Sequence, residues 1–176
     1  MRELRRNGQD HPRHRRRLIS RILAGGAAAS AASAATAFAY SHLENGHGAR
    51  PLNAIAHIYD GGDPPAHDGE NRRNTVLGLA IHTGACVFWS VLFEAILGRG
   101  ARQGIGQAAL AGAATAATAY VVDYYVVHER FRPGIEAYLS KRSMFGVYAA
   151  LAAGFAVAAL LTRERRPARR KAAAPA

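Results

Sequence analysis

The sequence has 176 residues, of which 49% are hydrophobic, 23 are lysine or arginine and 12 are aspartate or glutamate. The single cysteine excludes an intrachain disulfide, and no phosphate-binding loop, nucleophile elbow or dinucleotide-binding glycine fingerprint is present. The net charge of +11 is concentrated at the two ends of the chain, and the apolar residues are concentrated in four runs.

Each of the four apolar runs has the roughly 20 residues that cross a hydrocarbon core about 30 Å thick as an α-helix. They predict transmembrane helices at about 18–41, 74–97, 104–127 and 143–162, and hence an all-α, antiparallel four-helix membrane bundle over 18–162. A cleaved signal peptide ending near Ala37 to Ala39 is an alternative interpretation of the first run. The apolar stretch exceeds the usual 7–15 residues of a signal core, which favours a retained helix.

Basic residues predict the orientation of the bundle. The tails, 1–17 and 163–176, are rich in arginine, and the short loop between the second and third runs contains Arg99 and Arg102. The positive-inside rule therefore places both termini in the cytoplasm. Arginines beside a membrane gain about 1 kcal/mol each from anionic lipid, so the tails are expected to bind the bilayer surface and not nucleic acid. The second tail is expected to be disordered.

Two loop segments on the opposite, outer side predict short interfacial helices. Leu52–Tyr59 is apolar but too short to span the membrane. The segment RPGIEAYLSKR has the pattern of a second short helix that starts at Pro133. Small residues recur at three- or four-residue spacing in three runs, strictly every fourth residue in the last, which is typical of close helix packing in membranes. They are Gly26, Ser30 and Ser33 in the first run, Ala108, Gly112 and Ala116 in the third, and Gly146, Ala150, Gly154 and Ala158 in the fourth.

Ionisable residues inside the apolar runs are the candidate functional residues. His82 is expected about 10 Å below the outer surface, Asp123 about 6 Å below it, and His128 at its boundary. One hypothesis is a structural His–Asp or Tyr–Asp hydrogen bond that fixes packing. The other is a metal, haem or proton-relay site formed by His57, His82, Asp123 and His128. Glu94, near the inner end of its run, is interpreted as an interface residue that snorkels toward water.

Three sequence patterns give a family resemblance: N-A-x-x-H in the first outer loop, a histidine before F-W in the second run, and P-G-x-E-x-x-L-S before the last run. They resemble small uncharacterised bacterial inner-membrane proteins, which implies that location and no particular activity. The expected role is a non-enzymatic accessory or structural protein, with a homo-oligomer or another membrane protein considered as the partner. The matching residues are Asn53, Ala54, His57, His82, Phe88, Trp89, Pro133, Gly134, Glu136, Leu139 and Ser140.

Overall fold

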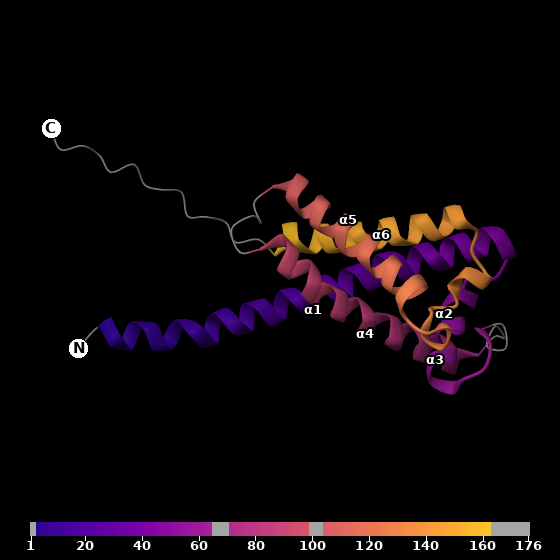
Figure 1. Cartoon of the computed structure of the whole chain (residues 1–176), viewed down its shortest axis with the longest axis horizontal. Helices are drawn as coiled ribbons and strands as arrows, with labels where there is room; N and C mark the ends of the chain where they lie inside the picture. Colours follow the sequence, from indigo (N-terminus) through magenta and orange to yellow (C-terminus); the bar gives the residue numbers. More distant parts are fainter. Residues whose placement is uncertain (1–2, 65–70, 99–103, 163–176) are drawn as a thin grey trace.

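A computed structural model describes residues 3–64, 71–98 and 104–162, which form helices and turns without any strand (Figure 1). Six α-helices are joined by a π-helical turn, η2, and by two 3-10 turns, η3 and η4. The elements are α1 (Glu3–Asn45), α2 (Arg50–Ile55), α3 (His57–Asp60), α4 (Arg72–Leu97), α5 (Ile105–Val121), η2 (Val122–Val126), η3 (Glu129–Phe131), η4 (Ile135–Ala137) and α6 (Lys141–Leu161).

The four long helices α1, α4, α5 and α6 form an antiparallel bundle (Figure 1). Helix α1 packs against α6 and α4, α5 packs against α6, and a smaller contact between α4 and α5 completes the bundle. The C-terminal end of α1 and the first turns of α4 and α6 lie at one end of the bundle together with α2, α3, η3 and η4, which we call the capped end. The opposite end is the terminal end. The predicted all-α four-helix fold is confirmed.

The helix boundaries agree with the apolar runs except in three places. Helix α1 extends from Glu3 to Asn45, well beyond the expected 18–41, because the basic segment before the run is also helical. The third helix changes to a π-turn after Val121. The second interfacial helix is only the 3-10 turn η4, which begins after Gly134 in the left-handed conformation and ends before Ser140 caps α6. The expected disordered tail, 163–176, lies outside the described residues.

All four long helices are long and apolar enough to cross a membrane, over Arg15–Asn45, Arg72–Leu97, Ile105–Val126 and Lys141–Leu161. Large apolar side chains also cover the outside of the bundle. On α4, for example, Val76, Phe88 and Val91 are each more than half exposed. Exposing so continuous an apolar surface on four helices to water would be unfavourable, whereas contact of that surface with lipid hydrocarbon is not. The chain is therefore a multi-pass membrane protein that contacts the lipid bilayer.

The helices approach one another at the small residues that the sequence singled out. A β-carbon on Gly154 would lie 2.5 Å from the Cα atom of Ala29, so α6 and α1 are in backbone contact there. A β-carbon on Gly112 would lie 2.5 Å from the carbonyl oxygen of Ala152, which joins α5 to α6. One on Gly26 would lie 2.6 Å from the backbone of α4. The small-residue faces are thus the helix crossings, as membrane packing requires.

The last turn of α1 is tied to the first turn of α6 by Glu44. Its carboxylate accepts hydrogen bonds from the backbone N–H of Ser140 at 2.9 Å, from the Ser140 hydroxyl at 2.8 Å, and from the Ser143 hydroxyl. Ser140 is itself the N-cap of α6 and accepts a bond from the N–H of Ser143. A carboxylate at a helix N-terminus also interacts favourably with the helix dipole. We call this group of three residues the clasp.

Replacing Glu44 with alanine is expected to open the clasp, because two serine hydroxyls and one backbone N–H lose their acceptor. Amide hydrogen exchange over the first turn of α6 should then accelerate several-fold, as expected when a helix cap is lost. Glu129→Ala is the matched control, since Glu129 is an exposed acidic residue of the same end. Unchanged exchange at the start of α6 in the Glu44 variant would contradict a structural role for the clasp.

Candidate functional site

A cavity of about 110 Å³ lies in the capped half of the bundle, bounded by α1, α2, α4, α5, α6 and η4. Its wall is mostly apolar, with Trp89 and Ile135 among its larger members. Five polar or thiol side chains also reach the wall. They are Ser33 on α1, His82 and Cys86 on α4, Asp123 on the π-turn, and Tyr148 on α6.

On one side of the cavity, His82 is held by α1. Its Nε2 atom lies 2.9 Å from the Oγ atom of Ser33 and 3.7 Å from the Sγ atom of Cys86. The Ser33 hydroxyl donates to the carbonyl oxygen of Ala29 at 2.7 Å, a back-bond that small hydroxyl residues commonly make in helices. The Ser33 hydroxyl is thus bonded on both sides, to Ala29 of its own helix and to His82 of α4.

On the other side, Asp123 is held by α6. The hydroxyl of Tyr148 donates to Oδ2 of Asp123 at 2.8 Å. Asp123 belongs to the π-turn Val122–Val126, in which one extra residue per turn changes the direction of the side chains that follow. Single π-turns inside helices occur frequently at functional sites. This turn presents a carboxylate to a cavity whose other walls are largely apolar.

The structure brings together two of the four predicted site residues. His82 and Asp123 line the same cavity, but each is bonded to a different helix, so the described hydrogen bonds contain no direct pair between them. Asp123 does form a Tyr–Asp hydrogen bond, but its donor is Tyr148 of α6, a residue that the sequence analysis did not single out.

His57 is a buried packing residue of the cap. It is 3% exposed, and its Nδ1 atom lies 2.7 Å from the carbonyl oxygen of Ala54. Nearby, the hydroxyl of Thr75 on α4 donates to Oδ1 of Asn53 at 2.6 Å. A β-carbon on Gly134 would lie 3.3 Å from Cε1 of His57, so the loop before α6 covers the imidazole. The N-A-x-x-H residues therefore form a buried turn that joins α2 and α3 to their neighbours.

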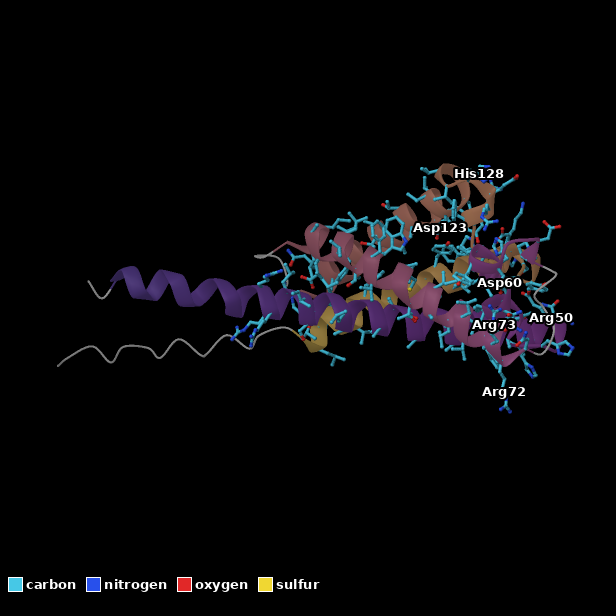
Figure 2. All side chains as sticks on the ribbon, turned by 90° about the horizontal axis from the view of Figure 1, so that it is seen from below. Arg50, Asp60, Arg72, Arg73, Asp123 and His128 are labelled. Atoms are coloured by element: carbon cyan, nitrogen blue, oxygen red, sulfur yellow. The ribbon has the colours of Figure 1, made fainter. Side chains whose placement is uncertain are left out.

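His128 lies apart from the cavity. It is exposed, and its Nδ1 atom accepts a hydrogen bond from the N–H of Arg130 at 3.3 Å. Figure 2 shows His128 at the margin of the capped end, with Asp123 set back along the bundle. Among the described residues, no three His, Cys, Asp or Glu side chains are grouped so that they could hold a metal ion. A metal or haem site with all four ligands stays a prediction that this geometry does not support.

Two ion pairs stabilise the ends of α4. At the terminal end, Arg21 on α1 lies 2.8 Å from Oε2 of Glu94, whose side chain is only 7% exposed. Glu94 is thus enclosed between helices and paired, where the sequence had suggested an interface residue reaching toward water. At the capped end, Arg73 binds both carboxylate oxygens of Asp60, at 2.7 and 2.9 Å (Figure 2).

No family model, curated protein or solved structure matches this chain. The site is therefore interpreted from its own geometry.

Proposed function

We propose that this chain is a protein of a bacterial inner membrane, with both termini in the cytoplasm and its first helix retained, and that it acts as a non-enzymatic accessory or structural protein. The location rests on the resemblance described above and on four spanning helices. The orientation rests on the arginines of the two tails, which adjoin the terminal end of the bundle.

One observation carries the non-enzymatic interpretation: several polar side chains between the helices are bonded to one another. Ser30 on α1 lies 2.9 Å from the hydroxyl of Thr83 on α4, and Ser33 on α1 binds His82 on α4. Arg21 pairs with Glu94 between the same two helices, and Tyr148 pairs with Asp123 between α6 and the π-turn. Such interhelical bonds stabilise membrane bundles, and their partners account for polar residues inside apolar runs.

Reporter fusions test the proposed orientation. A reporter that is active only in the cytoplasm, fused after Ala176, should be active, and a periplasm-specific reporter at the same position should be silent. A fusion made after Asp63, following the first helix alone, should give the opposite result. Periplasmic activity after Ala176 would contradict the proposal.

His82→Ala tests the structural role of the polar residues. It should lower the free energy of unfolding in detergent by about 0.6–2 kcal/mol, the range for one hydrogen bond between membrane helices. His128→Ala, the matched control, should change stability little, because the imidazole is exposed and its one bond, from the N–H of Arg130, is local and long at 3.3 Å. Metal analysis of the purified proteins should give the same content for wild type, His57→Ala and His82→Ala. Stoichiometric metal that both substitutions remove would overturn the non-enzymatic proposal in favour of a metal site.

A further inference from the structure

The cavity in the capped half of the bundle has an unusual combination of an apolar wall and an acidic group. Oδ2 of Asp123 accepts the hydrogen bond from Tyr148, whereas Oδ1 has no hydrogen-bond partner among the described residues. Neither lysine nor arginine is among the described residues that line the cavity. The half-buried carboxylate therefore faces a largely apolar space that contains no lysine or arginine, and a carboxylate in such surroundings is costly unless it is paired.

The size of the cavity limits what could pair with Asp123. A volume of about 110 Å³ holds several waters or one small organic molecule, since an apolar protein cavity of about 150 Å³ is large enough for benzene. The aromatic rings of Trp89 and Tyr148 also reach the wall. Aromatic faces attract organic cations, and they do so most strongly where water is excluded.

The cavity also has a route to the lipid. Ala85 on α4 lines the cavity and is exposed at the surface of the bundle. Ala119 and Asp123, which lie on the neighbouring α5 and π-turn, line the same space. Small side chains therefore line part of the cavity where α4 meets α5, and these two helices make the smallest contact among adjacent long helices. A membrane-dissolved molecule could enter there without crossing the cap.

We propose that this cavity is a binding site for a small organic amine, whose ammonium group pairs with Asp123 and whose short alkyl body occupies the apolar space beside Trp89 and Tyr148. The amine supplies a positive charge, which no lysine or arginine of the wall provides, and a hydrogen-bond donor for Oδ1 of Asp123. Tyr148 holds the carboxylate in place by donating a hydrogen bond to its other oxygen, Oδ2. The inference goes beyond the proposed accessory role and does not depend on the orientation of the chain in the membrane.

The chain contains its own reporter for this site, because Trp89 is the only tryptophan in the sequence and lines the cavity. The purified full-length protein in detergent is titrated with n-butylamine at a pH at which the amine is protonated, and with n-butanol as the uncharged match. We expect the fluorescence emission of Trp89 to change as amine is added and to reach a plateau at saturation. The alcohol should bind at least about tenfold more weakly, because it cannot form the charged hydrogen bond.

Three variants decide the outcome. Asp123→Asn preserves an acceptor for Tyr148 and should weaken amine binding about tenfold, bringing it to the level of the alcohol. Ala85→Phe fills the cavity while Asp123 is kept and should abolish saturation. Ala117→Phe, on an exposed position of α5 outside the cavity wall, should bind like wild type. If Asp123→Asn does not fold, the two alanine variants still decide the question.

Three results would overturn the proposal. The first is the absence of a saturable change with n-butylamine in the wild-type protein. The second is equal affinity for amine and alcohol, which would show an apolar cavity without a role for the carboxylate. The third is equal amine binding by Ala85→Phe and Ala117→Phe, which would place the binding event outside this cavity.

Discussion

Substitution of Gly78 with alanine is expected to detach α2 from α4 and to destabilise the capped end of the bundle. A β-carbon at this position would overlap the backbone carbonyl group of Leu52, and a backbone cannot move aside as a flexible side chain can. Overpacking of this kind costs about 1–3 kcal/mol and occasionally more, and we expect a loss near the upper limit. Thermal unfolding in detergent and hydrogen exchange over α2 would measure it, with α2 affected most.

Gly84→Ala is the matched control for this experiment. It lies on the same helix, and a β-carbon there would meet nothing within 4 Å. Because alanine is also the better helix former, this change should be neutral or slightly stabilising. If both variants had the same stability as wild type, α2 would not be packed on α4 as described.

The second large effect is expected at the ion pair between α1 and α4. Arg21→Met leaves the carboxylate of Glu94, which is only 7% exposed, without its cation. Breaking an enclosed pair by removing one partner costs about 3–5 kcal/mol, because the remaining charge is desolvated and uncompensated. The measurement is the free energy of unfolding in detergent or in lipid bicelles.

The double variant Arg21→Met, Glu94→Leu separates loss of the pair from loss of packing. Replacing both charges with apolar side chains of similar length removes the uncompensated carboxylate, and stability should return close to the wild-type value. A double variant as unstable as Arg21→Met alone would show that packing of the Arg21 side chain, and not the charge on Glu94, determines the loss.

The four spanning helices could be predicted because a span requires only an apolar run long enough to cross the bilayer. The length of such a run is read directly along the sequence. Helix α4, expected at 74–97, extends from Arg72 to Leu97. The faces on which helices meet were also readable, since glycine and alanine mark close approach wherever lipid is the solvent. The sequence analysis did not predict that α1 continues into the basic segment. The positions of the arginines indicate on which side of the membrane a segment lies, but they do not indicate its backbone conformation.

The partners inside the bundle were harder to predict, for a physical reason. Sequence gives the depth of a residue along its helix but not the rotation of that helix, and hydrogen bonds between helices depend on both. His82 and Asp123 line the same cavity, yet His82 binds Ser33 and Asp123 binds Tyr148. The π-turn at Val122–Val126 adds a further shift in side-chain direction that no periodicity in the sequence indicated.

The clasp also restricts the order in which this protein can be assembled by the ribosome and the insertion machinery. Glu44 and Ser140 are 96 residues apart, at the exit of the first span and the entry to the last. Because the chain is synthesised from its N-terminus, Glu44 is made before both serines of the clasp. It therefore lacks these hydrogen-bond donors until α4, α5 and the start of α6 have been delivered. An insertion intermediate with three spans therefore lacks the clasp at its capped end, and only the chain with all four spans can form it.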